Sequence, residues 1–225
     1  MDLRTVMLML AIGSFLFGLL LLIFRFNENK PQKVPFWAMA KMLQAAGSFM
    51  LYHRTTTFDG LTVLANIILL LGCAYEAWAV RILSGKFVRR RLHLFTSFAI
   101  ILACLLTLFL DKPYRSGLVF LLQGVLYFLP SMFLFSNSEL KFSLQLPLAV
   151  CYSAAGTVFL LAAILCFIFT ASALNLEGSP LFAVIPVVSY CLFLISGFIL
   201  LMFAKERSDL QVEEIQKALK ETEIR

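Results

Sequence analysis

The chain has 225 residues, of which 61% are hydrophobic and 14% are charged, and its net charge is +6. A soluble domain usually has about a quarter of its residues charged, and here the apolar residues form long blocks, so the composition excludes an ordinary soluble protein and indicates an integral membrane protein. Basic loops on the cytoplasmic side account for the positive charge, so we expect the lipid bilayer as a partner and no nucleic acid.

Seven apolar blocks follow one another along the chain, and we interpret each as a membrane-spanning helix. The expected spans are residues 3–24, 36–52, 61–83, 92–110, 117–135, 146–170 and 181–203. The predicted fold class is therefore an all-α integral membrane protein, with a bundle of seven transmembrane helices over residues 1–204. The six residues between the fourth and fifth spans, 111–116, are expected to link them.

The basic residues set the expected orientation of the bundle. If the N-terminus lies outside, 14 of the 19 Lys and Arg residues fall on the cytoplasmic side and 4 fall outside, with Lys41 inside a span. This distribution follows the positive-inside rule, so we predict that the N-terminus is outside and the C-terminus is in the cytoplasm. The outer segments are all short, so a signal sensed there must be small, lipid-like or a property of the bilayer.

The last span continues into a charged segment without a residue that breaks helices. Neither Gly nor Pro occurs from Phe198 to the end of the chain. We therefore predict a continuous helix that leaves the membrane and forms a cytoplasmic exit helix over residues 205–225. Pro186 lies inside the last span and is a candidate hinge, although most prolines in membrane helices produce static kinks.

The exit helix has one apolar stripe. Val212, Ile215 and Leu219 follow three- and four-residue spacings, which are typical of a weak coiled-coil seam. Glu213 and Lys217 are four residues apart and can form an ion pair on the surface of the helix. This pattern fits a rod that pairs two copies or transmits a small movement, and it equally fits a solvated or membrane-surface helix.

Two charged residues lie inside predicted spans, where a charge is costly. Lys41 and Glu76 both lie about 9–12 Å from the cytoplasmic ends of their spans, at about 1.5 Å per helical residue. We predict an ion pair between them, and the alternative is that Lys41 extends to the headgroups while Glu76 faces a polar pocket. Gln44, Asn66 and Gln123 are candidates for that pocket, although such residues more often form hydrogen bonds between helices.

No motif for catalysis, metal binding or cofactor binding is visible in the sequence. His53 and His93 lie at opposite ends of predicted spans, so they cannot bind one haem together. The five cysteines lie in apolar blocks and have no metal-binding spacing. No phosphate-binding loop or nucleophile pattern occurs. We therefore expect no metal, no cofactor and no enzyme activity from these residues.

Three stretches of the sequence resemble a known family. They are MDLRTVMLMLAIGSFLFGLLLLIFRF, PFWAMAKMLQAAGSFMLYHR and ANIILLLGCAYEAWAVRILSG. Together with the charged stretch KERSDLQVEEIQKAL, they resemble the N-terminal seven-helix sensor regions of bacterial diguanylate cyclases and histidine kinases. The resemblance implies an input module in the inner membrane of a bacterium, whose exit helix feeds a dimeric cytoplasmic output domain.

The departures from that family are large. The sequence has no GGDEF signature, no phosphoacceptor-histidine box and no ATP-binding domain. We therefore expect either the sensor part of such a protein or a short relative that acts through a partner. The resemblance assigns no ligand-binding residue, because no residue motif for the ligand can be matched.

These observations predict a sensory module of a signal-transduction protein. We expect a small apolar or membrane-derived ligand, a homodimer formed through the C-terminal helix, and a movement of the seventh helix as the output. The first alternative is a small transporter or channel with a polar path around Lys41, Gln44, Glu76 and Asn66. This alternative predicts a water-filled cavity that reaches the middle of the membrane. The second alternative is a membrane enzyme acting on lipids, for which no catalytic cluster is visible.

Overall fold

The computed structural model describes most of the bundle and part of the C-terminal segment. The described residues are 3–27, 35–53, 60–84, 88–136 and 144–168, together with positions 190, 191, 193–195, 197–199, 201, 202, 205, 206, 209, 212, 213, 215–217, 219 and 220. Within these residues the chain is helical apart from short turns and links, and no strand occurs.

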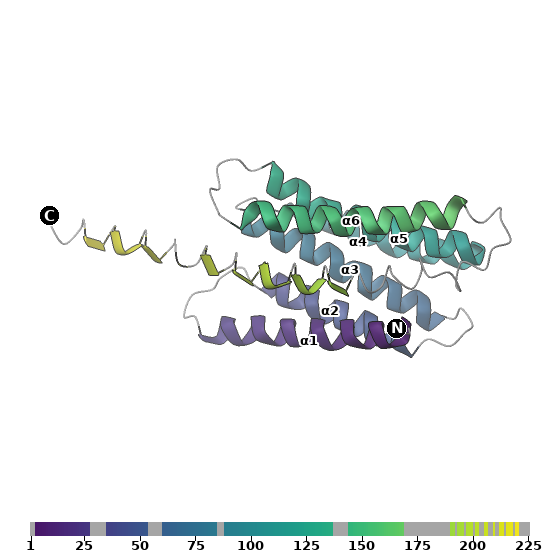
Figure 1. The fold of residues 1–225 in the computed structure, drawn as a ribbon, viewed down its shortest axis with the longest axis horizontal. Helices are drawn as coiled ribbons and strands as arrows, with labels where there is room; N and C mark the ends of the chain where they lie inside the picture. The colour runs from purple at the N-terminus through teal and green to yellow at the C-terminus, as the bar shows by residue number, and fades with distance from the viewer. Residues whose placement is uncertain are drawn as a thin grey trace.

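Six α-helices and one short 3-10 helix make up the continuous part of the described chain. They are α1 (Leu3–Asn27), α2 (Pro35–Tyr52), α3 (Gly60–Leu83), α4 (Arg90–Leu106), η1 (Thr107–Phe109), α5 (Lys112–Phe135) and α6 (Gln145–Ile168). The helices lie side by side, with α1 and α2 on one side, α5 and α6 on the other, and α3 between them (Figure 1).

Five of the described helices are long and apolar enough to cross a membrane. The candidate spans are Arg4–Ile23, Gly60–Ile82, Arg90–Phe109, Pro113–Phe135 and Gln145–Ile168. They indicate a multi-pass membrane protein. Helix α2 is not among them, because Lys41 and Gln44 lower its hydropathy. It packs against both α1 and α3, and its 18 residues correspond to a helix about 27 Å long.

The predicted spans agree with α1 to α6 to within a few residues, with one correction. Residues 112–116, which we expected to link the fourth and fifth spans, form the first turn of α5. Pro113 stands at the start of this helix, where its missing N–H would have had no partner in any case. The predicted seventh span, 181–203, lies partly outside the described residues, so the count of seven spans and their orientation remain predictions.

Helix α3 is the centre of the bundle, whereas α4 lies at its edge. In the apolar window of α3, 61% of the residues are buried, against 17% in that of α4. The side chains of α3 therefore contact protein on several sides, so charged or polar residues on α3 must find protein partners. Most of α4 instead faces outward, as expected for a helix in contact with lipid.

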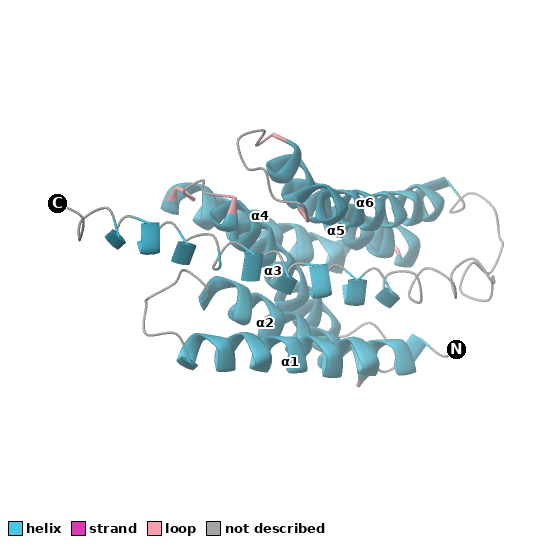
Figure 2. Cartoon of the chain, turned by 60° about the vertical axis from the view of Figure 1, so that its left-hand side comes forward, coloured by secondary structure: helices cyan, strands magenta, loops and turns pink. Residues whose placement is uncertain are grey.

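The C-terminal segment lies along the bundle and then leaves it. Its described positions, from Tyr190 to Lys220, are all helical. In both views the segment passes between the α1–α2 side and the α5–α6 side and leaves at one end of the bundle (Figures 1 and 2). We call this the exit end, and α1, α3 and α5 all end there. The predicted seam residues Val212, Ile215 and Leu219 lie on this segment and are exposed.

Candidate functional site

A buried ion pair joins α2 and α3. The Nζ atom of Lys41 on α2 lies 2.9 Å from Oε1 of Glu76 on α3. The side chains are only 1% and 3% exposed, so Lys41 does not extend to the headgroups. The two charges that the sequence places at similar depths therefore compensate each other, at a site where either charge alone would be costly.

Two more polar side chains complete the hydrogen bonding of Glu76. Gln44, one turn after Lys41, donates from Nε2 to Oε2 of Glu76 at 2.6 Å. Tyr152 on α6 donates its hydroxyl to Oε1 of Glu76 at 2.7 Å. Both carboxylate oxygens thus accept hydrogen bonds, and Oε1 accepts from both Lys41 and Tyr152. We call Lys41, Gln44, Glu76 and Tyr152 the polar cluster.

The ammonium group of Lys41 also makes three contacts. Besides Glu76, it donates to Oε1 of Gln44 at 3.1 Å. The ring of Phe193 in the C-terminal segment lies on its remaining side, with 4.5 Å from Nζ to the ring centroid. An ammonium has three N–H donors, and an aromatic face attracts a cation at this distance. The ammonium of Lys41 therefore connects three elements: α2, α3 and the C-terminal segment.

A weaker set of contacts connects the polar cluster to α5. Gln44 Nε2 lies 3.8 Å from the sulfur of Cys73, and that sulfur lies 4.0 Å from the hydroxyl of Tyr127. The ring of Tyr127 stacks on that of Tyr152, with 6.3 Å between the centroids. Sulfur is a weak hydrogen-bonding group, so these contacts add packing around the cluster more than polar stabilisation. Helix α5 thus packs against the polar cluster through Tyr127 and contributes no charged side chain to it.

Close approach of α2 and α3 makes this geometry possible. A Cβ atom added to Gly72 would lie 2.8 Å from Cγ of Gln44 and 2.9 Å from its backbone nitrogen. A Cβ atom at Gly47, further along the same interface, would lie 2.7 Å from the backbone nitrogen of Leu69. Small residues allow membrane helices to pack backbone to backbone. The two glycines therefore bring the Lys41 and Glu76 side chains within bonding distance.

A second set of polar groups lies near the exit end. The ring nitrogens of Trp37 and Trp78 and the Nε atom of Arg81 are buried, and none has a hydrogen-bond acceptor in the described part of the chain. The guanidinium of Arg81 lies 4.9 Å from the ring centroid of Phe133 and 5.9 Å from that of Trp78. Among the described residues, aromatic rings hold this cation, at the end where the sequence places most basic residues.

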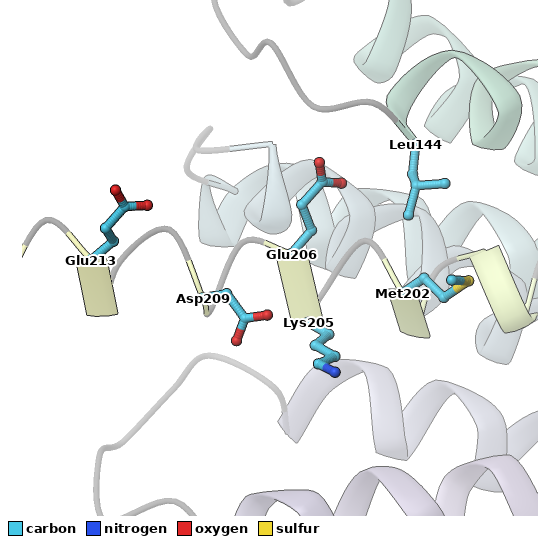
Figure 3. Close-up of a pocket in the computed structure, with 6 residues that line it drawn as sticks. All are labelled: Leu144, Met202, Lys205, Glu206, Asp209 and Glu213. Carbon is cyan, nitrogen blue, oxygen red and sulfur yellow. The ribbon is translucent and has the colours of Figure 1, made fainter.

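An open depression lies where the C-terminal segment leaves the bundle. It has a volume of about 410 Å³ and is lined by Leu144, Met202, Lys205, Glu206, Asp209 and Glu213 (Figure 3). Its polar side chains all come from a single segment. A ligand pocket needs polar groups that converge from several elements, and this depression lacks that arrangement.

The structure brings together some of the predicted site residues and separates others. Lys41, Gln44 and Glu76 meet in the polar cluster. Asn66 on α3 and Gln123 on α5 make no hydrogen bond to this cluster in the described part of the chain, and a polar pocket lined by Gln44, Asn66 and Gln123 stays a prediction. Pro186, the candidate hinge, lies outside the described residues.

Sequence reasoning missed Tyr152 and Phe193. Tyr152 stands in the interior of an apolar span, and a tyrosine hydroxyl that is buried there needs a partner. That position was the available signal for a polar contact, although it could not name Glu76. Phe193 is one of 23 phenylalanines, and nothing in the sequence distinguishes it from those that face lipid.

Among the described residues, no group of three His, Cys, Asp or Glu side chains could hold a metal ion. No family model, curated protein or solved structure matches the chain. The polar cluster and the C-terminal segment are therefore the features of the chain that bear on its function.

Proposed function

We propose that this protein is the membrane-embedded sensory module of a bacterial signal-transduction system, located in the inner membrane. In this proposal a small apolar or membrane-derived cue shifts the bundle. The C-terminal segment carries that shift to a cytoplasmic output domain or partner. One observation supports this proposal: the C-terminal segment contacts helices inside the bundle and then extends beyond it.

Inside the bundle, the segment is held by aromatic contacts. Phe193 is buried, and its ring meets that of Phe17 on α1 edge to face, with 6.0 Å between the centroids. Phe198 meets the same ring of Phe17 at 5.6 Å. A Cβ atom at Gly197 would lie 2.9 Å from Phe17, so the segment and α1 fit closely. A displacement of α1 or α2 would therefore act directly on the segment.

Outside the bundle, the described positions of the same segment are helical and exposed. The seam residues Val212, Ile215 and Leu219 are about half exposed, and they follow the three- and four-residue spacings of one helical stripe. A second copy of the chain would cover them in a parallel coiled coil. A homodimer formed through this seam is therefore part of the proposal, and it agrees with the resemblance to sensor regions of cyclases and kinases.

The transport alternative requires a hydrated polar path. The side chains of Lys41 and Glu76 are only 1% and 3% exposed, and their polar atoms are already paired within the protein. Such pairing favours a fixed connection between helices over a path for a solute. We therefore keep one proposed function.

The oligomeric state in lipid nanodiscs tests the proposal. We expect the full chain to be a dimer and a chain truncated after Ala204 to be a monomer. Ile215→Lys should also give a monomer, because the charge interrupts the seam. Gln216→Lys is the matched control, since Gln216 lies beside the seam. If the full chain and the truncated chain are both monomers, the segment is a passive end and the proposal fails.

A further inference from the structure

We propose that the contact between Lys41 and Phe193 is a latch that holds the C-terminal segment in the bundle. The polar cluster keeps the ammonium of Lys41 against the ring of Phe193, so that a displacement of α2 against α3 is passed to the segment. This inference rests on the proposed function, because it says which contact couples the bundle to its output.

Each of the three N–H donors of Lys41 has a partner, and one of these partners is the ring of Phe193. Glu76 and Gln44 take two donors, at 2.9 and 3.1 Å, and the Phe193 ring lies 4.5 Å from Nζ. Lys41 is buried while the segment is in place, so the ring of Phe193 and not water covers this side of the ammonium. A buried cation that loses a partner is costly. The position of the segment and the geometry of the ion pair are therefore linked.

The contact between Lys41 and Phe193 differs in kind from the aromatic contacts that also hold the segment. Phe198 touches the ring of Phe17, which is an uncharged contact, and Phe198 is 62% exposed. Phe193 touches Phe17 as well, but it is 7% exposed and also faces a charge. Because a cation–π contact weakens steeply when the cation moves off the ring, it responds to a small shift of α2 more sharply than apolar packing does.

A shift reaches the latch through the interface between α2 and α3. Lys41 comes from α2 and Glu76 comes from α3, and their contact depends on the close approach of these helices at Gly72. Any cue that changes the distance between α2 and α3 must move Lys41 relative to Glu76. Coupling between sites is reciprocal. Release of Phe193 should therefore also loosen the Lys41–Glu76 pair.

Stepwise fluorination of one ring tests the latch without changing the shape of the side chain. Phenylalanine at position 193 is replaced in the full chain by its mono-, di- and trifluoro forms, which progressively remove the negative face of the ring. The readout is amide hydrogen exchange over residues 190–202 in nanodiscs. We expect exchange to accelerate with each fluorine and to reach about tenfold for the trifluoro ring.

Two controls separate the latch from simple packing. The same series at position 198 should leave exchange unchanged, because in the described part of the chain the ring of Phe198 meets the uncharged ring of Phe17 and no cation. In a Lys41→Met background the series at position 193 should also have no effect. If that variant does not fold, the comparison of positions 193 and 198 in the native background decides alone.

The proposal is overturned if fluorination at 193 has no effect, or if it has the same effect as at 198. In either case Phe193 anchors the segment by packing only. Such a result would leave the dimer test of the proposed function unaffected, because that test depends on residues beyond position 204. If the full chain and the truncated chain are both monomers but the stepwise response is seen, the latch is supported and its role in signalling is contradicted.

Discussion

Two ion pairs in this chain have the same length and different surroundings. Lys41–Glu76 and Glu213–Lys217 both have 2.9 Å between nitrogen and oxygen. The side chains of the first pair are 1% and 3% exposed, whereas Lys217 and Glu213 in the second are 71% and 59% exposed. Water screens the second pair, so the distance between charges says little about what each pair contributes. Burial and the surrounding helices decide the contribution.

Removal of one buried charge should have the largest effect. We expect Lys41→Met to destabilise the protein by about 3–5 kcal/mol, because Glu76 remains buried without its cation. The measurement is unfolding in mixed micelles. The double variant Lys41→Met with Glu76→Leu should recover most of the loss, since apolar replacement of both partners is often neutral. Equal instability of the single and double variants would contradict this account.

Separation of α2 and α3 should have the next largest effect. Gly72→Val places two methyl groups against the backbone of Gln44, and we expect a loss of about 1–3 kcal/mol from overpacking. Gly60→Ala is the matched control, because a Cβ atom at Gly60 meets nothing within 4 Å. Thermal unfolding in detergent measures both. A wild-type melting temperature for Gly72→Val would show that α2 and α3 can separate without a loss of stability.

Loss of the tyrosine hydroxyl should have a moderate effect. Tyr152→Phe removes one of the two hydrogen bonds to Oε1 of Glu76 and leaves that of Lys41 in place. Hydrogen bonds between membrane helices contribute about 0.6 kcal/mol on average and at most about 1.7 kcal/mol, so we expect a loss in that range. Tyr114→Phe, at an exposed tyrosine, should leave stability unchanged under the same assay.

The exposed pair should contribute least. We expect Glu213→Gln to change stability by no more than about 0.5 kcal/mol, as is usual for helical surface pairs. The effect should disappear in high salt, because salt screens exposed charges. Circular dichroism at two salt concentrations measures it. A loss as large as that of Lys41→Met would mean that the pair is buried in an assembled dimer.

Much of the fold follows from local properties of the sequence. Uninterrupted apolar runs locate α1, α3, α4, α5 and α6 to within a few residues, because a helix that satisfies its own backbone can be recognised from hydropathy and length alone. For the first turn of α5 the composition predicts a link instead, because its residues are polar and include Pro113. Its helical start depends on backbone geometry at Asp111, which composition does not report.

The sequence by itself determined the helices, the buried charges of Lys41 and Glu76 and their matching depth, because a charge in an apolar span must find a partner. Only the tertiary structure decided that Tyr152 and Phe193 complete the cluster. These residues lie far from Lys41 along the chain, and hydropathy does not say which face of a helix meets which neighbour. Gly47 and Gly72 let α2 and α3 approach closely, and the packing of α6 and the C-terminal segment against them brings Tyr152 and Phe193 to the ion pair.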